Sequence, residues 1–201
     1  MTLARRHARA WLGLAVVALI VGCSEQNIRD AISAINAEFQ RDYEKTVKEN
    51  GTHVVSAAPK DAYDAVLAAL VKMGFVIKEQ SRELGVISAE APAPTPLSKG
   101  EFDQCAAIDL PRARDIIRPY LGPLAESFKF DAKGLDTVMT ATIIGAPAGS
   151  EISFTMRLRE VGPPDTKFPR RDYPPPNVLH CGLDKTWDAV NRELASIQKR
   201  G

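Results

Sequence analysis

The sequence predicts an α+β domain in which an antiparallel sheet carries two helices packed on one face, preceded by an N-terminal helical stem. Two observations lead to this fold class. Two pairs of β-prone runs are each joined by a short turn, and two other segments repeat apolar residues at helical spacing. The expected order is strand, helix, two strands, insertion, two strands, helix, and helices on one sheet face satisfy both periodicities.

The stem is predicted over residues 23–51. Between Glu25 and Asn50 the apolar residues recur every three or four positions, and Gly51 ends the helix. The members of this stripe are Ile28, Ile32, Ile35, Phe39, Tyr43 and Val47. The stripe could pack on the domain, pair with a second copy or rest on lipid headgroups. The mixed charge of the polar face argues against the headgroups.

The domain is predicted over residues 52–201. A short β-prone run begins at Thr52, and a helix follows with Pro59 near its first turn and Gly74 at its end. The face of this helix that we expect to be buried carries Tyr63, Val66, Leu67, Leu70 and Val71. Two strands around the turn "RELG" then form the first hairpin.

A proline-rich insertion is predicted at about residues 92–123. The segment "APAPTPLSKGEF" contains too many prolines for regular structure, and "DLPRARDIIRPYLG" indicates only a short helix, broken at Pro119.

The second hairpin gives the clearest β signal, with "DTVMTATIIG" and "SEISFTMRLREV" on either side of the turn "APAG". Apolar and polar residues alternate from Ile152 to Arg159, so one face of this strand is buried and the other is wet. A proline-rich strap is predicted at about residues 162–182. The closing helix then carries the apolar stripe Leu183, Trp187, Val190, Leu194 and Ile197.

Residues 1–22 are typical of an export signal. Arginines at positions 5, 6 and 9 precede an apolar run over residues 10–22, and this run is shorter than the roughly 20 residues that cross a bilayer. The residues "IVGC" at 20–23 resemble the lipobox of bacterial lipoproteins. The resemblance implies that Cys23 is acylated and becomes the first residue of the mature chain, which is then held on the membrane by its lipid. An ordinary secretory signal with a chance cysteine is the alternative.

The residue after the acylated cysteine is Ser24. In the sorting rule of this lipoprotein family, an aspartate there favours the inner membrane. The resemblance therefore implies the outer membrane, with the domain facing the periplasm.

The two remaining cysteines are Cys105 and Cys181. An exported chain enters an oxidising compartment, so we expect them to form a disulfide. The alternative is a metal site completed by His180 or His53, but no further Cys or His stands at ligand spacing.

The charge balance argues against nucleic acid as a partner. Removing residues 1–22 takes away three of 26 basic residues and none of the 25 acidic ones, so the mature chain is nearly neutral and lacks a basic stripe.

Catalytic motifs are also missing from the sequence. There is no Gly-x-Ser-x-Gly elbow. The carboxylate pairs Asp61/Asp64 and Asp184/Asp188 are near the starts of predicted helices, where they complement the macrodipole. We therefore predict no enzyme activity, no cofactor and no metal.

Two surface features are candidates for a partner site. Arg157 and Arg159 share the solvent-exposed face of their strand, and Arg170 and Arg171 are on the strap. If the strap folds over that face, these four arginines form a basic patch for an acidic partner. Tyr173 begins a Tyr-Pro-Pro-Pro run that could dock in an aromatic groove or strap its own domain, with the tyrosine as a peg.

The element order over residues 52–200 resembles the helix-grip modules of accessory lipoproteins in the outer-membrane barrel-assembly machine, and several lipoprotein families of unknown function. The segment "AAPKDAYDAVLAALVKMGF…GVISAE" and the Trp-bearing final helix carry the resemblance. The insertion and the cysteine pair depart from those modules. The resemblance implies a non-catalytic accessory or scaffold in an envelope complex. The alternative is a module that binds a small molecule or an envelope polymer between helices and sheet.

Overall fold

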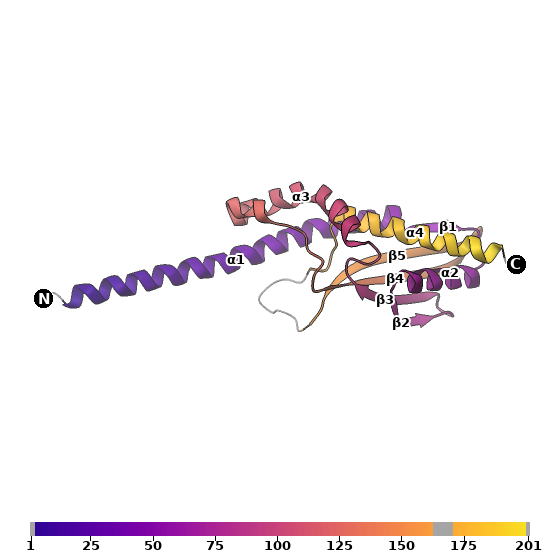
Figure 1. Cartoon of the computed structure of the whole chain (residues 1–201), viewed down its shortest axis with the longest axis horizontal. Helices are drawn as coiled ribbons and strands as arrows, with labels where there is room; N and C mark the ends of the chain where they lie inside the picture. Colours follow the sequence, from indigo (N-terminus) through magenta and orange to yellow (C-terminus); the bar gives the residue numbers. More distant parts are fainter. Residues whose placement is uncertain (1–2, 163–170, 200–201) are drawn as a thin grey trace.

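The computed structural model describes residues 3–162 and 171–199, with side chains described from Glu25 on. The elements are α1 (Leu3–Asn50), β1 (Thr52–Val55), α2 (Pro59–Lys72), β2 (Val76–Ser81), β3 (Val86–Pro92), α3 (Lys99–Leu121), a short 3₁₀ helix η1 (Gly122–Ser127), β4 (Leu135–Ala146), β5 (Gly149–Glu160) and α4 (Pro176–Gln198). The predicted α+β class is confirmed (Figure 1). The side chain of Cys23 and all of Arg170 lie outside the described residues.

The five strands form one antiparallel sheet in the order β1-β5-β4-β3-β2. Helices α2 and α4 pack on each other and on the sheet. The alternation in β5 buries Ile152, Phe154 and Met156 against these helices and leaves Arg157 and Arg159 exposed, as the period of two requires. The core is therefore the layer between one sheet face and this helix pair.

One expectation for α2 is wrong. Val71 is 54% exposed, whereas Ala62, Ala65 and Ala69 are fully buried together with Leu70. The small alanine side chains let the helix backbone approach its neighbours, and Val71 is turned away from the packed face.

The predicted short helix in the insertion is also wrong, because α3 begins at Lys99 and runs for 23 residues through both Pro111 and Pro119. A capping box starts it: Ser98 Oγ accepts a hydrogen bond from the Glu101 amide at 3.3 Å, and the Glu101 carboxylate accepts one from the Ser98 amide at 2.6 Å. Each proline removes one helical hydrogen bond. Packing of the buried α3 side chains against the rest of the fold offsets that loss.

The strap is shorter than predicted, since residues 176–182 belong to α4. Proline is favoured at the first helical position, which explains the start at Pro176. The cap comes from α3: the buried Asp109 carboxylate accepts the backbone N–H of Asn177 at 2.8 Å and its side-chain amide at 2.7 Å. Burial raises the pKa of Asp109, although the two hydrogen bonds from Asn177 act in the opposite direction.

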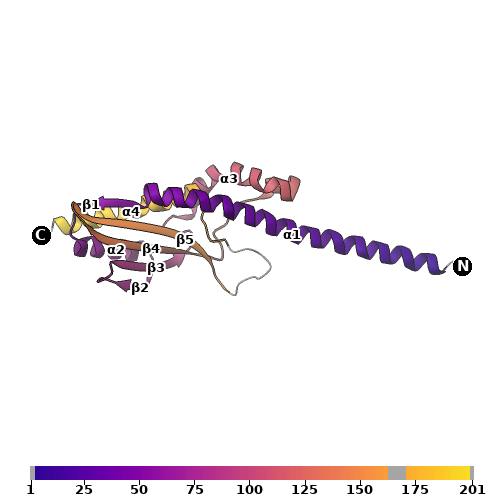
Figure 2. The ribbon, with the colours of Figure 1, turned by 180° about the vertical axis from the view of Figure 1, so that it is seen from behind.

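The stem helix docks on its own domain, one of the three placements its stripe allowed. The C-terminal part of α1 lies along α3, α4 and β1 (Figure 2). Phe39 and Tyr43 of this part are buried. A tight junction follows, because a Cβ at Gly51 would lie 2.5 Å from the Val47 carbonyl oxygen and 2.7 Å from that of Phe154. The stem and the sheet are thus joined without a flexible linker.

A pH-dependent contribution to stability is predicted at the start of α3. The hydrogen bond from Lys185, together with those from the Ser98 amide and hydroxyl, lowers the pKa of Glu101 to about 2. The lowered pKa means that the folded state favours the carboxylate. This stabilisation is present above the ordinary pKa of 4.5 and is lost as the pH falls to about 2.

We therefore expect Glu101→Gln to lose less stability than the wild type between pH 4.5 and pH 2, as measured by urea unfolding at several pH values. Glu83→Gln, which changes an exposed carboxylate in the turn after β2, is the control and should follow the wild type. Parallel curves for the wild type and Glu101→Gln would contradict this prediction.

Candidate functional site

An apolar cavity lies beneath the stem helix. Its aromatic wall comes from the segment between η1 and β4, where Phe128 and Phe130 meet edge to face at 5.1 Å between ring centroids. Phe130 also contacts Phe39 of α1 at 5.9 Å. Phe128 and Phe130 are half-buried, and Lys129 between them is exposed and also lines the cavity.

The cavity has a volume of about 110 Å³. Its walls come from α1 (Ile32, Ile35, Asn36, Phe39), from α3 (Phe102), from β4 and β5 (Leu135, Thr137, Met156, Leu158), from the strap and the start of α4 (Arg171, Tyr173, Pro174, Pro175, Val178) and from the segments 93–95 and 128–132. We call it the stem cavity. Three of the six stripe residues predicted for the stem therefore form one wall of a cavity.

The strap closes the stem cavity from a second side. Pro174 and Pro175 are buried in its wall, and Tyr173 meets Tyr43 of α1 edge to face at 5.2 Å. Of the two expectations for the Tyr-Pro-Pro-Pro run, the one that holds is packing on its own domain. Tyr173 anchors the run through its ring contact with Tyr43.

Three of the four arginines predicted as a basic patch, namely Arg157, Arg159 and Arg171, have partners within the molecule. Arg157 lies over the rings of Tyr43 and Tyr173, at 5.2 and 4.6 Å from their centroids. Such stacking of a cation on two aromatic faces is favourable by about 0.5–1 kcal/mol or more per ring. Arg157 therefore fastens the stem to the strap across the end of β5.

Arg159 and Arg171 pair with carboxylates. Arg159 donates to Glu90 at 2.7 Å and to Asp136 at 3.1 Å, and Arg171 donates to Glu160 at 3.3 Å. Burial raises the pKa of Glu90, but the hydrogen bonds and charges of Arg159 and Lys78 together lower it by more. The pKa of Glu90 therefore lies below its ordinary value. Arg159 and Arg171 are thus neutralised by neighbouring carboxylates instead of forming one cationic surface with Arg157.

The predicted disulfide between Cys105 and Cys181 is confirmed. It joins α3 to α4 and packs with Phe102 and Val178, which also line the stem cavity. The bond therefore holds the α3 wall of the cavity in place.

The histidines lie apart from this disulfide. His53 stacks on Trp187 at 4.2 Å, and His180 is exposed beside Asp184. Among the described residues, no group of three or more His, Cys, Asp or Glu side chains is placed to hold a metal ion.

Polar groups of the stem cavity are few. Thr137 is 2% exposed on its wall, and Lys129, Asp131 and Arg171 are exposed residues around it. Among residues 25–162 and 171–199, no carboxylate lies within ion-pair distance of the Lys129 ammonium. The rim thus carries two cations, one of them already paired with Glu160, and one carboxylate.

The stem cavity can hold a small apolar group. An engineered protein cavity of about 150 Å³ lined by Leu, Ile and Phe stays dry and binds benzene. At about 110 Å³ the stem cavity is of that order and is far smaller than the roughly 300 Å³ or more of a site that encloses a drug-sized molecule. It therefore fits a small apolar molecule or one end of a longer one.

No pattern in the sequence indicated this cavity. Its walls come from segments far apart in the chain, and residues 124–134 belonged to no element of the predicted fold. The alternation of Phe128 and Phe130 around a lysine was the one local signal available.

Within the part of the chain that the structure describes, no helix has both the length and the apolar character needed to cross a membrane. Comparisons of the chain with protein-family models, with curated protein sequences and with solved structures each gave no match.

Proposed function

We propose that the chain is an outer-membrane lipoprotein facing the periplasm, anchored by acylated Cys23, and that its non-catalytic domain binds an apolar ligand in the stem cavity. The observation that carries this proposal is the cavity itself, with aromatic and aliphatic walls from the stem, α3, the sheet and the strap. Concave apolar sites of this kind are the usual places where proteins hold small apolar ligands.

The anchor is supported by the residues before and at Cys23 and by the docked stem. Because α1 is packed on the domain up to Asn50, a lipid at Cys23 would hold the domain close to the membrane in a limited range of orientations. The stem cavity would then lie on the part of the domain from which the stem leaves.

Binding of an apolar ligand in the stem cavity accounts for the geometry better than recruitment of an acidic partner by the predicted basic patch does. A patch that recruits an acidic partner needs free cations, but Arg159 and Arg171 already pair with carboxylates and Arg157 lies over the rings of two tyrosines. The walls of the cavity, in contrast, place several large apolar side chains around empty space.

The test uses the full chain purified from bacterial membranes and native mass spectrometry, which removes detergent and retains tightly bound molecules. We expect one small apolar molecule on the wild type. Ala132→Leu fills the cavity and should abolish its binding, whereas Ala107→Leu adds the same group on the exposed side of α3 and should retain it.

Equal thermal midpoints for the two variants would show that Ala132→Leu acts on the cavity and not on folding. Retention of the molecule by Ala132→Leu would contradict the proposed site. In the same preparation the N-terminal peptide should have the mass of Cys23 with its lipid, and an unmodified peptide would contradict the anchor.

The accessory role remains the second candidate because of a row of exposed apolar side chains at the far end of the sheet. Val54 and Ile144 both pair with Glu151 of β5, so they share one face, and Leu84 is in the adjoining turn. These three side chains are 56%, 50% and 72% exposed. A cavity found empty on purified protein would favour this surface, and with it a protein partner, as the basis of function.

A further inference from the structure

The stem cavity follows the stem helix. Ile32, Ile35 and Phe39 are spaced by three and four residues, so they line the cavity over two helical turns, about 10 Å of helix axis at about 1.5 Å per residue. A wall of this length beside a small volume matches a narrow linear chain lying along the helix better than a compact ring system.

The cavity is also within reach of the membrane that would hold the anchor. Ile32 is nine positions after Cys23, and α1 is helical throughout, so the two positions are about 14 Å apart along the helix axis. The hydrocarbon core of a bilayer is about 30 Å thick, which gives each leaflet acyl chains that reach about 15 Å. A lipid next to the stem that is partly withdrawn from the leaflet can therefore reach the cavity with one chain.

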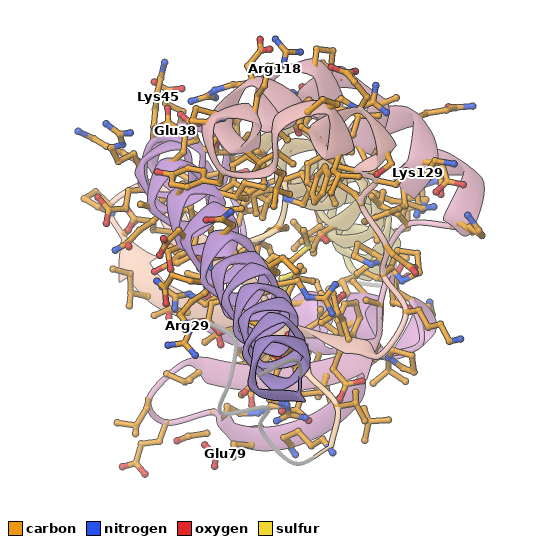
Figure 3. All side chains as sticks on the ribbon, turned by 90° about the vertical axis from the view of Figure 1, so that its left-hand side faces the viewer. Arg29, Glu38, Lys45, Glu79, Arg118 and Lys129 are labelled. Atoms are coloured by element: carbon orange, nitrogen blue, oxygen red, sulfur yellow. A yellow bond between two sulfur atoms is a disulfide. The ribbon has the colours of Figure 1, made fainter. Side chains whose placement is uncertain are left out.

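The rim favours an anionic headgroup. Lys129 is exposed and has no ion-pair partner among the described residues. Arg171 adds a second cation, a guanidinium that Glu160 already neutralises. Asp131 is the opposing charge. Seen from the end at which α1 leaves the domain, Lys129 lies at the outer rim of the molecule (Figure 3). A lysine ammonium binds phosphate as a point charge.

We infer that the occupant of the stem cavity is one acyl chain of a phospholipid from the anchoring membrane, with the lipid phosphate beside Lys129. This inference rests on the proposed apolar-ligand function and names the class of ligand. The lipid would be partly withdrawn from the bilayer, with its chain end among Ile32, Ile35 and Phe130 and its headgroup at the rim.

The test is photo-cross-linking in intact cells. Cells that produce the full chain are fed a fatty acid with a photoactivatable diazirine near its methyl end, which they incorporate into phospholipids. After irradiation, tryptic peptides of the purified protein are examined for adducts. The tryptic peptide of residues 30–41 carries the cavity wall of α1. The N-terminal tryptic peptide of the mature chain, residues 23–29, carries the lipidated Cys23 and contributes nothing to the cavity.

We expect adducts of phospholipid mass on the peptide of residues 30–41 and several-fold fewer on the peptide of residues 23–29. Simple proximity to the membrane would give the reverse order, which would overturn the inference. Ala132→Leu, and independently Ile35→Trp from the α1 side, should reduce the adduct on residues 30–41 about tenfold, while Ala107→Leu should leave it unchanged.

Lys129→Glu tests the headgroup at an exposed position. It should reduce the phospholipid adduct several-fold, with Lys133→Glu as the nearby control that retains it. An unchanged adduct in Lys129→Glu would overturn the placement of the phosphate.

Two further outcomes would overturn the phospholipid as occupant. One is a cross-link between residues 30–41 and the lipid on Cys23, which would show that the protein's own anchor fills the cavity. The other is an adduct with the mass of the free fatty acid. If native mass spectrometry finds a bound apolar molecule that is not a lipid, the proposed function stands and this inference alone fails.

Discussion

The double variant Cys105→Ser/Cys181→Ser is expected to unfold with a free energy about 4 kcal/mol lower than that of the wild type. The two cysteines are 76 residues apart in the sequence, and on the chain-entropy model a cross-link of this length removes a conformational entropy worth about 4 kcal/mol from the unfolded chain. A loss of this size is a large part of the total stability of a single domain, about 5–15 kcal/mol.

The loss should also have a local component at α3. This helix contains two prolines, and it is held to the rest of the fold by the disulfide, by Asp109 at the start of α4 and by ion pairs from Arg112 to Glu38 and Asp42. Without the disulfide, the cavity wall at Phe102 loses its covalent support. We therefore expect the double variant to bind less of the apolar ligand even where it remains folded.

Urea unfolding with and without reductant measures this effect. Reductant should shift the wild-type midpoint to that of the double variant and should leave the double variant unchanged. A wild type that unfolds at the same urea concentration in both conditions would contradict the prediction.

The sheet and its two covering helices were predictable because each has a local pattern. Alternation from Ile152 to Arg159 specifies which face of β5 is buried, and the spacing of Leu183, Trp187 and Val190 specifies the buried stripe of α4. These patterns depend on residues a few positions apart, so a single sequence contains all the information needed.

Helix α3 shows where local patterns conflict. The capping-box spacing of Ser98 and Glu101 marks the start of the helix in the sequence, but Pro111 and Pro119 argue against a long helix with equal force. Tertiary contacts decide the outcome, namely the disulfide and the burial of Ile117 beside Ala31 of α1. No sequence pattern within the insertion identifies Cys181 or Ala31 as the residues that α3 contacts.

The candidate site was less predictable, for the same reason. Its walls come together only after the stem, the strap and α3 have docked, and each contributes a few apolar residues that any core could use. The pairing of Arg159 with Asp136 depends on the register of β4 and β5, in which these two residues are directly opposite. The alternation along the strand places Arg159 on the solvent-exposed face of the sheet, but it does not identify the residue that pairs with Arg159.

Trp187→Ala is expected to destabilise the fold by about 3–5 kcal/mol, the range typical of removing a large buried aromatic side chain. Trp187 is 4% exposed, stacks on His53 of β1 and meets Phe154 of β5 edge to face at 4.9 Å. Its indole N–H donates to the Asn50 carbonyl oxygen at 2.8 Å. A single side chain thus joins α4 to the sheet and to the last residue of the stem.

Trp187→Phe separates these two roles. It keeps most of the apolar packing but leaves the Asn50 carbonyl without its donor, which should cost about 1–3 kcal/mol. Val71→Ala, at an exposed position on α2, should change stability by no more than about 0.5 kcal/mol and serves as the control. Urea unfolding gives all three values.

Hydrogen exchange then shows whether Trp187 holds the stem. If the bond to Asn50 fastens the junction, Trp187→Phe should raise the exchange rates of amides in residues 39–50 by a larger factor than those of the central strands β4 and β5, because the helix end loosens while the core stays packed. Equal increases in both regions would mean that Trp187 supports only the global fold. Selective loosening would instead show that the stem is held at its C-terminal end. The wall of the cavity formed by Ile35 and Phe39 would then depend on a contact at Asn50, about three to four turns away along α1.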